Sequence, residues 1–101
     1  MRALEQKKLL TIIASKQLEE MILKQLAPHG IGGYTVVSGH GAGASGIQSG
    51  MLDIDTNILI YIIMSEPRLE NVLVEIDKMM DKGYRLKALI TDIDILPRKT
   101  S

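Results

Sequence analysis

Apolar residues recur along the chain at two spacings, which together predict four strands and two helices. Short runs of β-branched and aliphatic residues are typical of buried strands. Such runs occupy residues 9–14, 34–38, 57–64 and 87–95. Ser15 and Ser65 each precede a stretch with apolar residues at helical spacing, so each serine is expected to N-cap a helix. Gly83 is the expected end of the second helix, and the predicted order is β-α-β-β-α-β.

This order predicts a ferredoxin-like α+β sandwich, formed by a single domain of residues 1–101 with both helices on one face of an antiparallel sheet. The other face of such a sheet is usually polar, because water covers it. The strands at 9–14 and 57–64 are instead apolar at both alternating positions. The residues after Ile95 are too few and too polar to cover that face. Since a large apolar patch is rarely left exposed, we predict a homo-oligomer in which another subunit covers it.

Composition narrows the classes of function. Twelve basic and 12 acidic residues give a net charge of +0, which argues against nucleic acid as the partner. The absence of cysteine excludes disulfides and thiolate chemistry. The longest apolar run, Ile58 to Met64, is too short to insert into a membrane, and the first residues do not resemble a secretion signal. We therefore expect a cytoplasmic protein.

A glycine-rich loop is predicted from Gly39 to Gly50. Its length and lack of periodicity favour a functional loop over a plain connection. The loop contains the pattern G-x-G-x-x-G at Gly41–Gly46, but a strand follows where a dinucleotide fingerprint needs a helix, so we treat that match as accidental. Neither Lys nor Arg occurs between Lys24 and Arg68. An anion bound near this loop is therefore expected to draw its cations from the second half of the chain or from a neighbouring subunit.

The titratable residues do not form a catalytic or metal-binding pattern, so we predict no catalytic residue, no metal site and no enzyme. The only histidines are His29, expected at the surface of a helix end, and His40, in the loop. Asp53 and Asp55 are expected to be solvated at a strand start. The pair Arg85 and Lys87 lies where the last strand begins, a position at which a phosphate group can be met.

Three short motifs resemble the PII-like signalling proteins, which are trimeric ferredoxin-like regulators. Lys7–Ala14 is similar to their first strand, and Gly33–Val37 is similar to their G-x-T-V second strand. Gly39–Gly41 resembles the G-x-G that opens their mobile T-loop, which would cover about residues 39–52 here.

The resemblance implies a ligand and a set of site residues. In that family an adenine nucleotide (ADP, AMP or ATP) lies in the cleft between subunits, beneath the base of the T-loop. The residues that this implies for nucleotide binding are Gly33, Tyr34, Thr35, Gly39, His40, Gly41, Arg85, Lys87 and Arg98.

Two departures from the standard family indicate a branch. Gly83–Lys87 stands where standard members have a glycine-rich phosphate loop. Residues 40–52 also contain no tyrosine, whereas the T-loop of standard members carries a tyrosine that is covalently modified. The chain therefore looks more like the carboxysome-associated and bicarbonate-transport-associated branches. That resemblance implies bicarbonate as a further ligand, and a bicarbonate transporter or a carboxysome-related protein as the target.

Two other readings of the fold stay open. A small-molecule module of the ACT type would bind an amino or organic acid through Arg85 and Lys87, and would not respond to nucleotides. A CutA-like trimer would hold a metal at His29 or His40. A third reading, an acylphosphatase-like hydrolase, is not supported. It would need an arginine-containing phosphate loop after the first strand, where this chain has Ala14-Ser15-Lys16.

Overall fold

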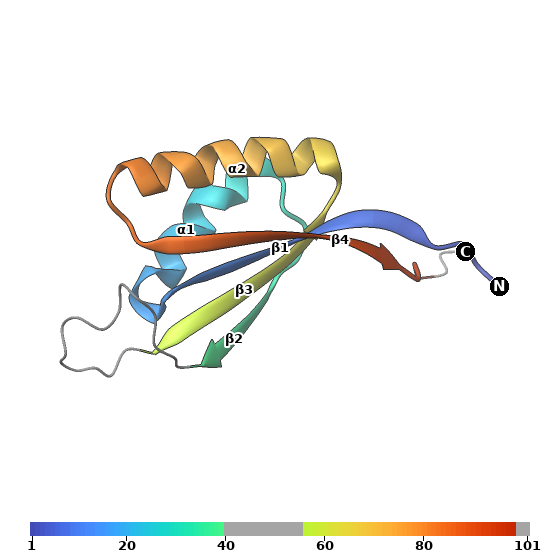
Figure 1. The fold of residues 1–101 in the computed structure, drawn as a ribbon, viewed down its shortest axis with the longest axis horizontal. Coiled ribbons are helices and arrows are strands. Elements are labelled where there is room, and N and C mark those ends of the chain that lie inside the picture. The colour runs from blue at the N-terminus through green and yellow to red at the C-terminus, as the bar shows by residue number, and fades with distance from the viewer. Residues whose placement is uncertain (40–55, 99–101) are drawn as a thin grey trace.

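The computed structural model describes residues 1–39 and 56–98. Two helices pack on one face of a four-stranded antiparallel sheet (Figure 1), which confirms the predicted ferredoxin-like α+β fold. The elements in chain order are β1 (Glu5–Ser15), η1 (Lys16–Leu18), α1 (Glu19–Leu26), η2 (Ala27–His29), β2 (Thr35–Gly39), β3 (Asn57–Met64), α2 (Glu66–Asp81) and β4 (Leu86–Ile95).

The sheet has the strand order β2-β3-β1-β4, so β1 and β3 are central and β2 and β4 form the two edges. Paired residues carry numbers of the same parity throughout. Leu10, for example, lies opposite Ile62 on one side and Ile90 on the other. Side chains alternate between the two faces of a strand, so the even-numbered positions of all four strands share one face and the odd-numbered positions share the other.

The core lies between the even-numbered face and the helices. Ile60 and Ile62 of β3 are completely buried there, as are Ile22 of α1 and Val72 of α2. The full set of buried apolar residues is Leu10, Ile12, Ala14, Ile22, Leu26, Ile58, Ile60, Ile62, Met64, Leu69, Val72, Ile76 and Met79. With no phenylalanine or tryptophan in the chain, aliphatic side chains and methionine supply nearly all of the apolar area whose burial drives folding.

The helix ends follow the predicted capping pattern with one difference. The Ser65 hydroxyl accepts a hydrogen bond from the Arg68 amide at 3.4 Å, as an N-cap does. Ser15 accepts from the Gln17 amide at 3.3 Å, but it caps the short 3-10 helix η1, and α1 starts only at Glu19. Gly30 (φ 74°) and Gly83 (φ 98°) adopt the left-handed conformation that ends a helix.

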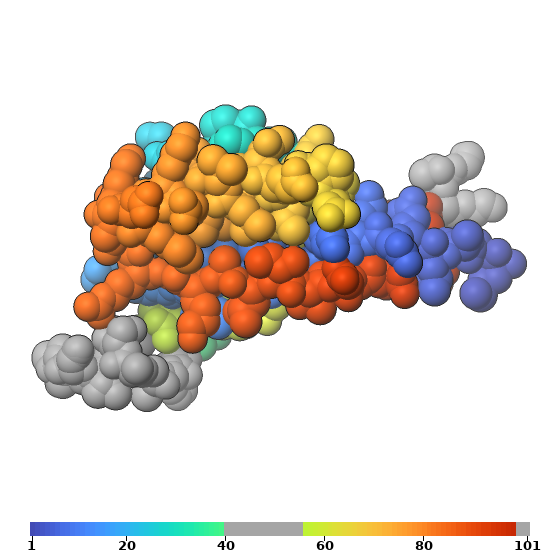
Figure 2. Space-filling view, turned by 45° about the horizontal axis from the view of Figure 1, so that its top comes forward, coloured from blue at the N-terminus to red at the C-terminus, as the bar shows by residue number. Residues whose placement is uncertain are grey.

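Strand β1 begins four residues earlier than predicted, at Glu5 rather than Leu9. Residues 5–8 pair with residues 92–95 of β4 and form an arm that projects beyond the helices (Figures 1 and 2). The polar segment from Glu5 to Lys8 has no apolar pattern, so only the partner strand identifies it as β-structure. The second strand is displaced by one residue from the prediction, at 35–39 instead of 34–38.

The odd-numbered face is apolar and uncovered in the single chain, as the sequence predicted. Ile63 is 48% exposed, Val37 45% and Leu89 43%. Leu9, Ile13 and Leu59 are half-buried on the same face. We call this surface the open face. In residues 1–39 and 56–98, the helices are too short and too polar to cross a membrane.

Candidate functional site

Four of the predicted nucleotide-binding residues lie along the β2 edge of the sheet. Gly33 and Tyr34 directly precede β2, Thr35 is its first residue and Gly39 is its last. Thr35 pairs with Tyr61 of β3, and Gly39 pairs with Asn57. A Cβ atom added at Gly33 or Gly39 would meet nothing within 4 Å. The backbone at both glycines is therefore open to the close approach of a ligand.

Two predicted cations lie at the opposite edge. Arg85 is the residue before β4 and Lys87 is the second residue of the strand, and both are exposed. Lys87 pairs with Ile13 of β1, so its odd number places it on the open face. Thr35 and Gly39 occupy odd positions on the same face, at the other edge.

A single chain does not bring these residues to one place. Three strand spacings separate β2 from β4, about 14 Å across the sheet. Arg98 follows the far end of β4, and the eight steps along the strand from Lys87 to Ile95 alone span about 27 Å. The structure therefore divides the described candidates into three separate places: the β2 edge, the start of β4 and the segment after β4. His40 and Gly41, like Asp53 and Asp55, lie outside the described residues.

Two cations near β2 were missed by the sequence analysis. Tyr34, which is 52% exposed, lines a broad hollow of about 730 Å³ together with Lys16 and Lys24. The Lys16 amide also donates to the Thr56 carbonyl at 2.9 Å, next to the start of β3. Glu19 and Glu20 line the same hollow, and Nζ of Lys16 lies 3.7 Å from Oε1 of Glu19. The expectation that cations near the loop come from the second half of the chain, or from a neighbour, therefore stays a prediction. The missed signal was topological, since η1 directly follows β1, the strand beside β3.

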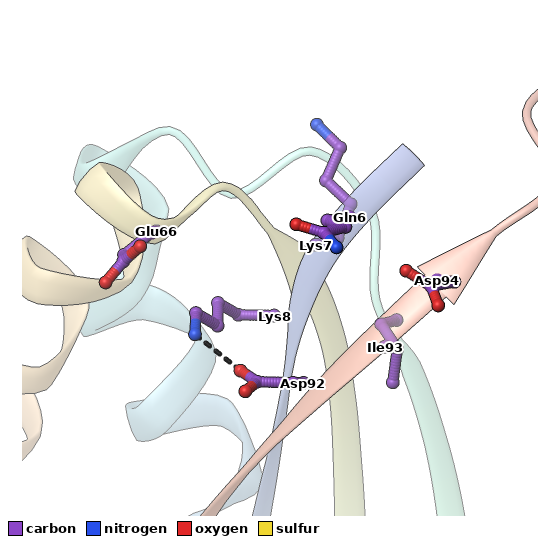
Figure 3. Close-up of a pocket in the computed structure, with 7 residues that line it drawn as sticks. All are labelled: Gln6, Lys7, Lys8, Glu66, Asp92, Ile93 and Asp94. Atoms are coloured by element: carbon purple, nitrogen blue, oxygen red, sulfur yellow. Dashed lines mark hydrogen bonds and ion pairs between the residues drawn. The ribbon is translucent and has the colours of Figure 1, made fainter. Parts of the chain in front are cut away.

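A second cavity, of about 330 Å³, lies beside the arm (Figure 3). Lys8 forms an ion pair there with Asp92 of β4, and Glu66 at the start of α2 adds its negative charge. The hydrogen bond to Asp92, followed by the charges of Asp92 and Glu66, raises the pKa of Lys8 above its usual value, although partial desolvation opposes the shift. The cavity is lined by Gln6, Lys7, Lys8, Glu66, Asp92, Ile93 and Asp94. It contains none of the predicted nucleotide-binding residues, and we interpret it as a charged joint between the arm and α2.

His29 reaches the surface at the helix end only in part, because its side chain also meets α2. Its side chain is 30% exposed, and its Nε2 atom lies 3.3 Å from Oε1 of Glu75 in α2. Within the described residues, no group of three or more His, Asp or Glu side chains is placed to hold a metal ion. His29 therefore joins the two helices in this structure, and the described part of the chain gives the CutA-like reading no metal site.

We compared the chain with known protein families and with curated protein sequences. The family model described as nitrogen regulatory protein P-II matches residues 7–96. A search of curated protein sequences finds no match to the chain.

Solved structures provide the second comparison. A PII-like signalling protein from Thermus thermophilus is 27% identical, with 95% of this chain and 94% of that chain covered and a TM-score of 0.75. CPII from Thiomonas intermedia, bound to ADP and bicarbonate, is 25% identical, with 94% and 93% covered and a TM-score of 0.79. A DUF3240 family protein from Shewanella baltica is 14% identical, with 94% and 97% covered and a TM-score of 0.69, and shares the fold alone.

Proposed function

The chain belongs to the nitrogen regulatory protein P-II family, and from this membership we propose that it is a non-catalytic regulator that binds an adenine nucleotide between its subunits. The similar CPII structure holds ADP and bicarbonate, which supports the choice of ligand. ADP, AMP and ATP share the adenosine that the backbone at the β2 edge would contact, and they differ only in the phosphates that the cations would meet.

The separation of the candidate residues is the observation that carries this proposal. Residues at the β2 edge and Lys87 lie on opposite edges of one sheet, and Arg98 lies beyond its far end. One small ligand can contact all three groups only where the edges of different subunits meet. We therefore assign Gly33, Tyr34, Thr35 and Gly39 to one side of the cleft, with Arg85 and Lys87 supplied across the subunit boundary.

The open face supports the oligomer that such a cleft requires. Val37 of β2, Ile63 of β3 and Leu89 of β4 are each more than two-fifths exposed, and the half-buried Leu9, Ile13 and Leu59 share this face with them. Because apolar patches of this kind mark association surfaces, we propose that copies of the chain cover it. A closed ring of three subunits repeats one heterologous contact, and we propose that this contact brings β2 of one chain near β4 of the next.

The cations have distinct parts in the proposed site. Lys87 and Arg85 begin a strand on the side of the cleft opposite β2 and would meet the phosphates as charge-assisted donors. Arg98 would reach the same phosphates from another subunit. The remaining candidates, His40 and Gly41, belong to the T-loop-like segment at about 39–52, which we propose to transmit the bound state to a target.

The proposal also includes a second ligand, bicarbonate, and a target protein. Bicarbonate in the CPII structure supports a role in inorganic carbon metabolism, in the cytoplasm, with a bicarbonate transporter or a carboxysome-related protein as the target. Residues Ile47, Met51 and Leu52 of the glycine-rich segment are the apolar side chains that we propose the target recognises.

Isothermal titration with ATP, ADP and AMP, with and without bicarbonate, tests the ligand. We expect saturable binding near one nucleotide per subunit and a higher affinity when bicarbonate is present. Absence of heat with all three nucleotides at micromolar protein would refute the nucleotide site. Binding of an amino or organic acid in the same assay would then favour the ACT-like reading.

Mixing two variants tests whether the site is shared between subunits. Lys87→Ala and Arg98→Ala are each expected to weaken ADP binding by about tenfold or more, because each removes a charge-assisted contact. When the two variants are refolded together, some interfaces receive Lys87 from one subunit and Arg98 from another. A tight-binding fraction should then return, and its absence would contradict a site formed across subunits.

A further inference from the structure

The chain turns from the helices to β2 at His29 and Gly30, and two side chains of α2 hold this corner. The guanidinium of Arg68 donates from Nη1 to the carbonyl oxygen of Gly30. Two turns further along α2, Oε1 of Glu75 lies 3.3 Å from Nε2 of His29. Arg68 and Glu75 are seven residues apart and therefore lie on the same side of the helix. Both side chains thus contact the short segment that ends the α1–η2 region.

The geometry of Gly30 allows this contact. Gly30 has φ 74° and ends η2, where the last carbonyl groups of a helical segment lack partners and attract a cation. A Cβ atom at Gly30 would lie 3.0 Å from Nη1 of Arg68 and 3.2 Å from its Cζ atom. Glycine is therefore favoured here both for its backbone conformation and for the room that it leaves the guanidinium.

The anchored corner leads directly into the candidate site. Residues 31–34 form neither helix nor strand, and Cβ atoms added at Gly32 or Gly33 would meet nothing within 4 Å. Ile31 packs against the core. On the far side, the segment is held by Thr35, where the five-residue edge strand β2 begins. The positions of Gly33 and Tyr34 therefore depend on how firmly Gly30 is held to α2.

We propose that Arg68 is a positioning residue for the nucleotide site: it ties the Gly30 carbonyl to α2 and so fixes the backbone at Gly33 and Tyr34 in the conformation that receives the ligand. This inference rests on the proposed function. A flexible glycine-containing segment that is ordered before binding loses less entropy when the ligand arrives. Arg68 thus acts on affinity without contacting the nucleotide, and the His29–Glu75 pair supports the same corner.

Hydrogen–deuterium exchange of the ligand-free protein tests the anchor by itself. Arg68→Ala should speed the exchange of the amides that follow Gly30, including those of Thr35–Gly39 that pair with β3, while those in the core of β3 keep their protection. Arg68→Lys retains a cation and should restore part of the protection. Glu70→Ala, at an exposed position on the same helix, is the matched control and should leave the segment unchanged. Unchanged exchange in Arg68→Ala would overturn the proposal.

Titration with ADP tests the effect on the site. We expect Arg68→Ala to weaken binding about threefold to tenfold, as residues remote from a ligand commonly do when they couple to it, and Glu70→Ala to bind as wild type. Faster exchange combined with wild-type affinity would overturn the positioning role. If wild-type protein binds no nucleotide, the proposed function fails and the positioning role fails with it, while the exchange data still report whether the anchor exists.

A pair of glycine variants tests whether residues 31–35 depend on Gly30 in particular or on the stability of the fold in general. Gly30→Ala and Gly83→Ala both place a side chain at positive φ, at 74° and 98°, but a Cβ at Gly83 would meet nothing within 4 Å. Gly30→Ala should therefore release residues 31–35 to exchange, and Gly83→Ala should not, although both variants lose stability. Equal exchange of this segment in the two variants would contradict an anchor at Gly30, and circular dichroism would verify that both are folded.

Discussion

The two faces of the sheet are similar in sequence and opposite in environment. On β3, Ile60 and Ile62 point toward the helices and are completely buried, whereas Ile63, one residue further, is 48% exposed. Isoleucine therefore lies in the core on one face of the strand and on an uncovered surface on the other. Alternation along a strand reports how many of its faces are covered in the final assembly, and that assembly can include other copies of the chain.

On the helix-covered face most apolar residues lie beneath the helices, with Ile90 of the edge strand β4, which is 45% exposed, as an exception. Leu10, Ile12 and Ala14 of β1 are buried beneath the helices, but Lys8 on the same face lies beside the N-terminus of α2 and pairs with Asp92. Charged residues thus replace apolar residues where the helical layer ends. The open face carries apolar residues on all three of its longer strands, between Glu5 and Lys7 at the arm and Lys87 at the start of β4. This is the pattern expected if another surface covers its middle.

The largest effect is expected from a truncation in the covered face. Ile60→Ala should lower the free energy of unfolding by about 2–5 kcal/mol, because it removes a fully buried side chain and leaves a cavity. Denaturant unfolding at a fixed protein concentration measures the change. Val74→Ala, at a position 57% exposed on α2, is the control and should change stability by less than about 0.5 kcal/mol. Similar losses in the two variants would contradict the assignment of the core.

A charge on the open face should separate assembly from folding. Ile63→Lys is expected to reduce the native mass to that of a single chain while the secondary structure is retained, because a lysine in an apolar interface is strongly unfavourable. Light scattering and circular dichroism measure the two properties. Val74→Lys adds the same charge at a comparably exposed position and should leave the native mass unchanged. An unaltered mass in Ile63→Lys would remove the open face as the interface.

A smaller effect is expected at the helix cap. Ser65→Ala should destabilise the protein by about 1 kcal/mol, because the Arg68 amide loses its hydrogen-bond acceptor. Ser65→Asp keeps an acceptor at the N-cap and should recover most of the loss in a thermal melt. A full loss in both variants would assign the effect to something other than capping.

The smallest effect is expected at the exposed Lys8–Asp92 pair. The pKa of Lys8 is raised in the folded protein above 10.5, so the pair contributes stability below that pH and loses it as pH rises through the folded-state pKa. Asp92→Asn should slightly lower the melting temperature at neutral pH, and the difference should vanish in strongly alkaline solution. A difference that grows with pH would contradict this sign. Asp94→Asn, on the same strand, is the matched control.

Most of the fold could be predicted because its signals are local. The run from Asn57 to Met64 became β3 with the predicted bounds, and Ser65 caps α2 as expected. The arm could not be predicted, because Glu5–Lys8 is polar and becomes a strand only through pairing with β4. The start of α1 was also misplaced, since the same Ser15 cap is compatible with a 3-10 turn or an α-helical turn.

The candidate site was less predictable, because its residues are related through topology and not through spacing. The motif around Gly33 and Thr35 was visible in the sequence, but its distance from Lys87 follows only from the strand order. The pairing of His29 with Glu75 and of Arg68 with Gly30 joins residues about forty positions apart, and helix periodicity does not contain such pairs. The roles of the nucleotide-binding residues stay predictions until binding is measured.

The strand order also has a consequence for how the chain reaches its folded state. The first strand lies in the middle of the sheet, and its partners come late: Lys8 pairs with Met64, and Glu5 pairs with Ile95 near the other end of the chain. During synthesis, β1 therefore cannot pair with β3 or β4 until most of the polypeptide has emerged. Since folding slows as contacts connect more distant parts of a sequence, this small domain should fold more slowly than a helical bundle of equal length.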